Sequence, residues 1–110
     1  MTSLPFAFDG PPELSGPMLS ALSRVVDPEL SLSIVDVGLV YGVSVTEGEV
    51  RVRVTMTSAA CPVIDVIVED IELELDRLLP AGTGIVVELC WEPPWTPQMM
   101  SERARRFMQG

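Results

Sequence analysis

The stretch Thr55-Met56-Thr57-Ser58-Ala59-Ala60-Cys61-Pro62 joins a predicted strand to a predicted long helix. Valine and methionine side chains alternate with charged residues and threonines through residues 49–57, which is typical of a half-buried strand. From Ile64 onward the apolar residues recur at helical spacing, so an amphipathic helix is predicted over residues 62–79. The sequence therefore predicts a strand, a turn of small residues and a helix at this point.

Cys61 lies at the entrance of this helix, directly before a proline suited to a first helical turn. The helix dipole and nearby backbone N–H groups favour a thiolate there, and the thiolate is the form that binds metal or attacks an electrophile. The alternative is that Cys61 is a small buried apolar residue, as most lone cysteines are. The residues alone leave both interpretations open.

The composition is that of one globular domain and excludes several functional classes. The 110 residues carry a net charge of −9 and include seven arginines but no lysine or histidine. Such a chain lacks the basic patch that nucleic acids require, and it cannot use a histidine of its own for serine or cysteine hydrolysis. A metal or cluster site would need carboxylates, a second copy of the chain or a partner protein.

We expect a cytoplasmic protein with no membrane partner. No apolar run approaches the roughly 20 residues that span a bilayer. Residues 1–10 hold no basic residue, so a signal peptide is not expected. A structural disulfide between the two cysteines is the less expected use of these residues in a reducing compartment.

The remaining periodicity predicts a small α+β fold. Residues 1–17 are rich in proline and glycine and are expected to form a flexible arm without regular elements, followed by a single domain at 18–110. The predicted order is α-β-β-α-β-α, with segments at 18–26, 37–45, 49–57, 62–79, 84–92 and from 97 onward.

We expect a two-layer sandwich with a three-stranded mixed sheet and helices packed on one face. Residues 37–57 form a hairpin, and the crossover helix makes strands 49–57 and 84–92 parallel, with strand 37–45 between them. In strand 37–45 the residues expected on one face are Leu39, Tyr41, Val43 and Val45. The open sheet edges leave room for a homodimer.

Three surface features are candidates for contacts, each with a plainer alternative. Asp27 and Glu29 flank a rigid proline and could face a cation or a partner, although a backbone-capping turn is favoured from the residues alone. The long helix carries an acidic stripe, either a solvated face or a docking surface for a basic partner, formed by Asp65, Glu69, Glu72 and Asp76. Arg51 and Arg53 are expected on a solvated face of the sheet, and the role of Cys90 is left undecided.

The segment Trp91-Glu92-Pro93-Pro94-Trp95-Thr96-Pro97 is too rich in proline for a strand or a helix. Aromatic residues in a rigid exposed segment often anchor contacts, so the candidate partner-binding residues are Trp91, Pro93, Pro94 and Trp95. The alternative is that the two indole rings close over the core. Thr96 is predicted to cap the last helix, with Pro97 at its first position.

Three ordered motifs together resemble the SufT/PaaD-like family of iron–sulfur cluster assembly proteins, which carry the FSCA domain. The first motif is Val26-Asp27-Pro28-Glu29-Leu30 with Ile34-Val35-Asp36-Val37-Gly38-Leu39-Val40-Tyr41. The second is Val54-Thr55-Met56-Thr57 with Cys61-Pro62, and the third is the segment 91–97 followed by Met99-Met100-Ser101-Glu102. The resemblance covers roughly residues 18–109, and the family shares its domain with the eukaryotic cytosolic cluster-targeting factor.

This resemblance implies a factor that helps to transfer iron–sulfur clusters to apo-proteins and that acts with other assembly proteins. The family's functional cysteine corresponds to Cys61, which would bind iron or a cluster transiently. The resemblance groups further site residues with this cysteine, namely Asp27, Glu29, Leu30, Asp36, Thr57 and Ser58. Ala60 departs from the glycine often found before the cysteine, which restricts the backbone of the turn.

Alternative functions stay open at this point. A metal-free adaptor would recruit assembly partners and clients through the segment 91–95 and the acidic helix. An accessory protein of a phenylacetyl-CoA oxygenase-type system is disfavoured, since the cysteine-rich C-terminal extension of PaaD-type members is missing. An enzyme with Cys61 as its nucleophile is the weakest alternative because the chain has no histidine. We therefore expect a carrier or assembly factor and not an enzyme.

Overall fold

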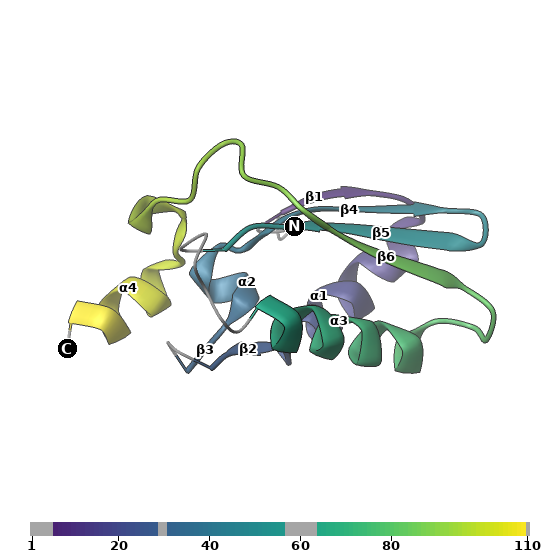
Figure 1. The fold of residues 1–110 in the computed structure, drawn as a ribbon, viewed down its shortest axis with the longest axis horizontal. Coiled ribbons are helices and arrows are strands. Elements are labelled where there is room, and N and C mark those ends of the chain that lie inside the picture. The colour runs from purple at the N-terminus through teal and green to yellow at the C-terminus, as the bar shows by residue number, and fades with distance from the viewer. Residues whose placement is uncertain (1–5, 29–30, 57–63, 110) are drawn as a thin grey trace.

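The computed structural model describes residues 6–28, 31–56 and 64–109, and Figure 1 shows the arrangement of their helices and strands. No helix in these ranges is both long enough and apolar enough to cross a membrane. In chain order the elements are β1 (Ala7–Asp9), η1 (Pro12–Leu14), α1 (Ser15–Ser23), β2 (Val26–Asp27), β3 (Leu32–Ser33), α2 (Ile34–Val37), β4 (Val40–Thr46), β5 (Glu49–Val54), α3 (Ile64–Leu78), β6 (Gly84–Leu89), η2 (Pro97–Met99) and α4 (Glu102–Gln109).

A four-stranded mixed sheet with the strand order β1-β4-β5-β6 forms one layer of the molecule, and β2 and β3 form a separate two-stranded sheet. The predicted antiparallel hairpin of β4 and β5 is confirmed, and so is the parallel direction of β5 and β6, although these two strands pair directly instead of flanking β4. The expected three-stranded sheet is wrong, because β1 adds a fourth strand. The expected strand order is wrong as well, because β5 and not β4 lies in the middle of the three predicted strands. β1 occupies the outer edge of β4, so the chain returning from α3 pairs with the remaining edge of β5.

The fourth strand comes from the proline-rich region in which we expected no regular element. Ala7–Asp9 pairs in parallel with residues 42–44 of β4, and Phe6 and Phe8 pack against the core. Pro17 lies in the first turn of α1, where a proline removes no helical hydrogen bond. The expectation was wrong because a strand of three residues fits between breakers without including one.

The chain before β4 forms the short helix α2, which was not predicted and which takes up the first residue, Val37, of the strand predicted over residues 37–45. The Ser33 Oγ accepts a hydrogen bond from the backbone N–H of Val35 at 3.1 Å and so caps this helix. Gly38 ends it with a φ of 86°, a conformation that favours glycine. The strand therefore begins only at Val40.

A register shift between Val40 and Gly42 breaks the alternation expected in β4. Val40 is buried and Tyr41 is only half-buried, although the sequence pattern placed Tyr41 on the core face. A bulge adds one residue to one strand of a pair, and this reverses the faces of all residues on one side of it. The predicted assignment holds for Val43 and fails at Tyr41.

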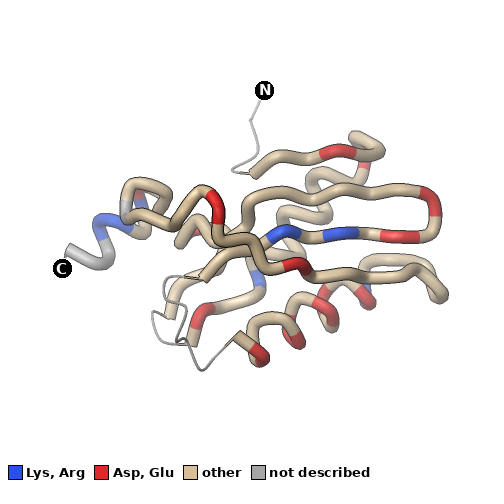
Figure 2. The backbone as a smooth tube through the Cα atoms, turned by 45° about the horizontal axis from the view of Figure 1, so that its top comes forward, with Lys and Arg blue, Asp and Glu red and all other residues tan. Residues whose placement is uncertain are grey.

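The helices α1, α2 and α3 lie on one face of the four-stranded sheet, as predicted (Figure 1). The core between the layers is formed by β-branched residues of β5 and by one side of α3, namely Val50, Val52, Val54, Ile67, Ile71 and Leu75. The opposite face of β5 carries charged side chains, and Figure 2 shows their basic and acidic positions along the strand. In the part of the chain that the structure describes, helices therefore cover one face of the sheet and leave the other face without a helical layer.

Residues 90–99, which we term the crossing segment, lead from β6 over the uncovered face of the sheet at the end near α2 (Figure 1). The predicted single helix from Pro97 is interrupted: η2 ends at Met99, and α4 begins at Glu102. The backbone N–H of Ala104 donates to the Ser101 Oγ at 3.1 Å, so Ser101 and not Thr96 caps this last helix.

Candidate functional site

The short helix α2 is the point where the three segments that carry the family motifs meet. The first motif includes α2 itself. The second reaches it at the end of β5, where Thr55 N–H donates to the Leu39 carbonyl at 2.8 Å. The third reaches it through Trp95, whose Nε1–H donates to the Val37 carbonyl at 2.8 Å. Segments far apart in the sequence are thus tied by backbone carbonyls to α2 and to the residues that directly follow it.

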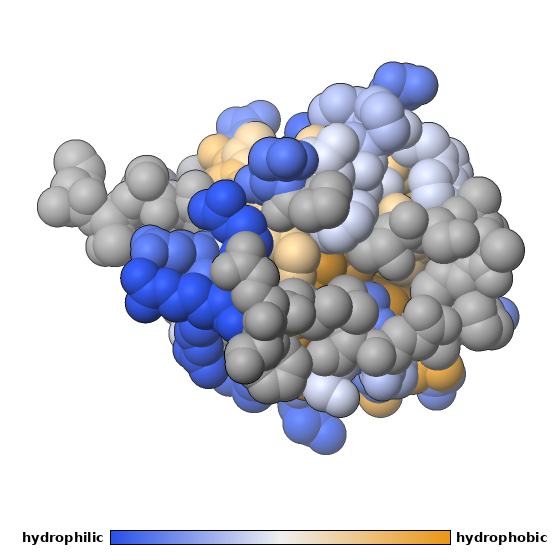
Figure 3. All heavy atoms as spheres, turned by 90° about the vertical axis from the view of Figure 1, so that its left-hand side faces the viewer, coloured by the Kyte–Doolittle hydropathy of each residue, from blue (hydrophilic) through white to orange (hydrophobic). Residues whose placement is uncertain are grey.

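The same end of the molecule holds the β2–β3 hairpin and the beginning of α3 (Figure 1). The hairpin is attached to α2 by the Ile34 N–H, which donates to the Val25 carbonyl at 2.9 Å. Figure 3 views this end and shows apolar surface in the middle, beside strongly hydrophilic side chains on the left. An apolar area at the convergence of several motifs is the kind of place where a protein binds a ligand or a partner.

Asp27, the first acidic residue of the predicted site, is the last residue of β2 and has an exposed fraction of only 2%. A buried carboxylate is stable only when it has polar or charged partners, and Asp27 has at least one. Its backbone carbonyl accepts a hydrogen bond from Ser31 N–H at 2.8 Å, which closes the turn of the hairpin. The chain therefore forms a turn at this point, as the plainer alternative expected, and the backbone carbonyl of Asp27 closes it.

Asp36, the second acidic residue, lies in α2 and faces the C-terminal region. Its Oδ1 accepts a hydrogen bond from the Ser101 hydroxyl at 3.1 Å, and its backbone carbonyl accepts one from Ser101 N–H at 2.7 Å. These two bonds hold the beginning of α4 against α2. Sequence reasoning missed this role of Ser101, although a serine one residue before a helix is a common capping signal.

Thr55 is buried, with an exposed fraction of 1%, although the sequence pattern placed it on the polar face of the strand. Strand β5 ends at Val54, so the alternation no longer decides where the next side chains point. The Thr55 Oγ1 is buried without a hydrogen-bond partner among the described residues. Buried hydroxyl groups of this kind are uncommon in native proteins and favour a nearby polar ligand or ordered water.

The other predicted site residues are Glu29, Leu30, Thr57, Ser58 and Cys61, and they lie outside the described residues. The described elements nevertheless fix the two ends of the predicted turn: Met56 is buried after β5, and Ile64 begins α3. Within residues 6–28, 31–56 and 64–109, no group of three histidine, cysteine or acidic residues could hold a metal ion. Cys90, which does lie in these ranges, is a free thiol whose Sγ donates to the Glu92 carbonyl at 3.1 Å.

The two tryptophans of the predicted partner-binding segment have different environments. Trp95 packs against the core and is fixed to α2 by its indole N–H, as the plainer alternative proposed. Trp91 has an exposed fraction of 43%, and both prolines between the two rings are exposed as well. Trp91 is thus available for contacts, whereas Trp95 mainly supports the fold.

Comparison with known proteins shows the class to which this fold and site belong. The family described as "Iron-sulfur cluster assembly protein" matches residues 18–88, so the chain belongs to this family. The match confirms the resemblance seen in the sequence motifs.

The individual relatives are similar over most of their length. The chain is 40% identical over 89 residues to "Fe-S protein maturation auxiliary factor YitW" of Bacillus subtilis, which covers 80% of this chain and 86% of that protein. It is 42% identical over 82 residues to "Fe-S protein maturation auxiliary factor SufT" of Staphylococcus aureus, covering 74% of this chain and 92% of that protein.

A solved structure supports the fold. The crystal structure of a "Domain of Unknown Function DUF59" from Bacillus anthracis superposes with a TM-score of 0.82 and 35% sequence identity. The superposition covers 88% of this chain and 92% of that chain. The architecture described above is therefore that of the family.

Proposed function

We propose that this chain is a maturation factor for iron–sulfur proteins, which aids the transfer of clusters to apo-proteins through Cys61. The observation that carries the proposal is the meeting of all three family motifs at α2, in a chain that belongs to a family of iron–sulfur cluster assembly proteins. Cys61 lies in the sequence between β5 and α3, and these two elements end and begin beside α2 (Figure 1).

The cluster is cargo in this proposal and not a resident cofactor. Clusters are held by cysteine thiolates, commonly four of them, and this chain has two cysteines and no histidine. One chain therefore offers too few soft ligands for permanent binding, whereas a single thiolate supports transient binding together with a second copy or a partner protein. Asp27 and Glu29 are proposed to supply oxygen ligands or to orient the partner. The chain acts as a carrier or assembly factor in the cytoplasm and catalyses no reaction of its own.

Anaerobic reconstitution with iron and sulfide tests the role of Cys61. We compare the wild type with Cys61→Ser and with the matched control Cys90→Ser, and follow the visible absorption of the cluster and its transfer to an apo-ferredoxin. The proposal expects a labile cluster in the wild type and in Cys90→Ser, and its loss in Cys61→Ser. Equal clusters in all three proteins, or loss only in Cys90→Ser, would contradict it.

A metal-free adaptor is the second candidate, favoured by the exposure of Trp91 at 43% and of the acidic stripe on α3. This function requires partner binding but no cluster. If none of the three proteins forms a cluster and all three still bind an assembly partner in a pull-down, the adaptor is the correct function. Trp91→Ala should then weaken that binding, whereas Trp95→Ala should mainly destabilise the fold.

A further inference from the structure

A cavity of about 450 Å³ lies between the uncovered face of the sheet and the crossing segment. Its walls come from the beginning of β4, from β5 and from the crossing segment, namely Gly38, Val40, Tyr41, Arg53, Cys90, Glu92, Pro93 and Met99. Its volume falls within the range of about 300 to 1,000 Å³ that is usual for small-molecule sites. Neither Asp27 nor Asp36 of the predicted cluster site lines it.

The cavity is held open by fixed contacts on both of its sides. The Tyr41 hydroxyl donates to the Pro93 carbonyl at 2.6 Å and thereby fixes the distance between sheet and crossing segment. Gly38 leaves room for the backbone of Met99, which a Cβ at this position would clash with. The walls are therefore formed by the folded chain before any ligand arrives, and preformed walls reduce the entropy lost on binding.

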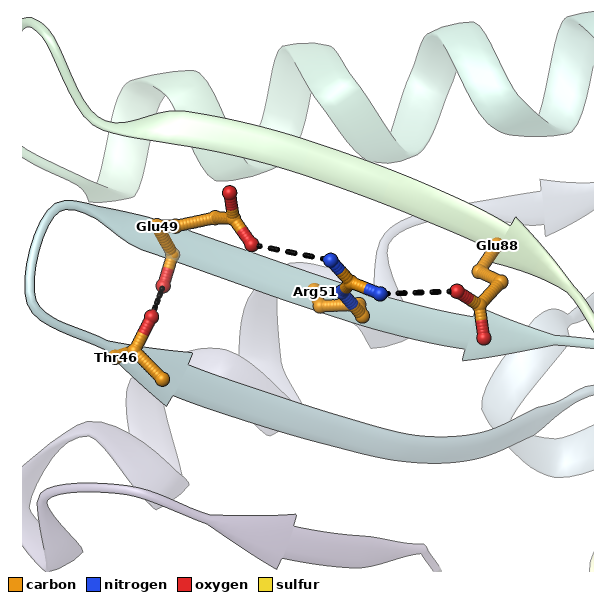
Figure 4. A network of polar contacts seen from close by, with 4 residues as sticks. All are labelled: Thr46, Glu49, Arg51 and Glu88. Atoms are coloured by element: carbon orange, nitrogen blue, oxygen red, sulfur yellow. Dashed lines mark hydrogen bonds and ion pairs between the residues drawn. The ribbon is translucent and has the colours of Figure 1, made fainter.

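The cationic group of this cavity is Arg53, whose environment differs from that of its neighbour on the same face. Arg51 makes ion pairs with Glu88 at 3.2 Å and with Glu49 at 3.4 Å (Figure 4). Among the residues that the structure describes, no carboxylate lies within ion-pair distance of Arg53. The protein has a net charge of −9, yet Arg53 lines a cavity and makes no ion pair with any described carboxylate, so its guanidinium is available to an anionic ligand.

The strand opposite Arg53 explains how the guanidinium reaches the cavity. Gly42 pairs with Arg53 in the sheet, and a Cβ on Gly42 would lie only 2.6 Å from the Arg53 Nη2. The missing side chain thus lets the guanidinium lie across β4, beside Tyr41. The sequence shows only a glycine inside a predicted strand, and the structure places it opposite Arg53.

We propose that this cavity binds a small amphipathic monocarboxylate, with its carboxylate on Arg53 and its apolar part against Tyr41, Pro93 and Met99. A guanidinium forms paired hydrogen bonds with a carboxylate, and these charge-assisted bonds are stronger than neutral ones. Glu92 also lines the cavity, and because its repulsion of an anion grows with the charge of that anion, it favours a monoanion over phosphate or sulfate dianions. The inference is independent of cluster handling by Cys61.

The test uses hexanoate as the probe, with 1-hexanol as the same tail without charge and sulfate as a dianion without a tail. Each is titrated into the ¹⁵N-labelled full chain, and amide shifts are followed by NMR. We expect hexanoate to shift the signals of Tyr41, Arg53 and Cys90 and to bind at least about 10-fold more tightly than either control compound. Equal binding of hexanol, or shifts located elsewhere on the chain, would overturn the proposal.

Two arginine variants provide a matched comparison, since both side chains are exposed on the same strand face. Arg53→Gln should weaken hexanoate binding about 10-fold or more, whereas Arg51→Gln should change it by less than about 2-fold. Equal effects of the two substitutions would refute a specific role of Arg53.

The reaction rate of the Cys90 thiol tests the proposal in the wild-type protein. Because its thiol lines the cavity, bound hexanoate should slow its reaction with N-ethylmaleimide, as resolved at Cys90 by peptide mass spectrometry. A reaction rate at Cys90 that is unchanged at saturating hexanoate would place the carboxylate outside the cavity and overturn the assignment.

Discussion

The two faces of the four-stranded sheet use opposite kinds of interaction. The face toward α1 and α3 is apolar, and Val50, Val52 and Val54 of β5 are each at most 1% exposed there. The other face carries the charged residues of β5 and is crossed at one end by residues 90–99. The difference lies within a single strand, since alternate residues of β5 point to opposite faces.

The covered face mainly stabilises the fold, whereas the uncovered face is available for binding. Removal of apolar surface from water supplies most of the folding free energy, and the covered face provides it. Exposed ion pairs contribute little to stability, so the residues of the uncovered face are freer to serve binding. The two arginines of β5 differ in this respect. Arg51 is paired with carboxylates of its own sheet, whereas Arg53 lines a cavity.

The largest effect is expected where the crossing segment touches α2. Gly38→Ala should lower the free energy of unfolding by about 3 kcal/mol, because it combines an unfavourable positive φ with a backbone clash at Met99. Gly48→Ala is the matched control, since Gly48 has a φ of 82° and open space around it, and should cost about 1 kcal/mol. Urea denaturation measures both, and equal losses would show that the contact with Met99 is unimportant.

A smaller effect is expected from the covered face of β5. Val52→Ala should lower the free energy of unfolding by about 2 kcal/mol, because it removes buried methyl groups and leaves a cavity. Arg51→Ala, one position earlier on the opposite face, should cost about 0 to 1 kcal/mol. If chemical denaturation gives the two variants the same stability, the contrast between the faces fails.

The smallest effect is expected from the hydrogen bond that links β4 to the crossing segment. Tyr41→Phe removes the donor to the Pro93 carbonyl and should cost about 1 kcal/mol. The same substitution should increase the reaction rate of Cys90 with N-ethylmaleimide, because the crossing segment loses a hydrogen bond that holds it to the sheet. Thr46→Val, which removes a longer bond of 3.3 Å in the hairpin, should leave that rate unchanged. Identical rates in both variants would contradict the role of Tyr41 in the cavity wall.

The sequence predicted the features that depend on local periodicity. The hairpin, the long helix, the parallel pair and the helical layer on one face all follow from alternating and helical apolar patterns. The order of strands could not be derived, because it depended on Ala7–Asp9, three residues whose pairing with β4 is non-local. Tyr41 was assigned to the wrong face because a bulge leaves no periodic signal.

The site was predictable to a similar extent. The family motifs identified the segments that meet at α2. The bonds that bring them together are mostly made by backbone carbonyls, such as those of Val37 and Leu39, which no side-chain pattern reveals. The cavity of Arg53 was missed because its walls come from β4, β5 and the crossing segment, and only the fold brings these together.

The three-residue strand β1 has a consequence for how the sheet opens. It is joined to β4 over only Ala7–Asp9, whereas β5 is paired on both sides along most of its length. Short terminal elements separate from a native protein at a lower free energy than central strands do. Amide hydrogens in β1 should thus exchange with solvent well before those of β5, and the exposed edge of β4 is where a strand from another chain would first find unpaired amides.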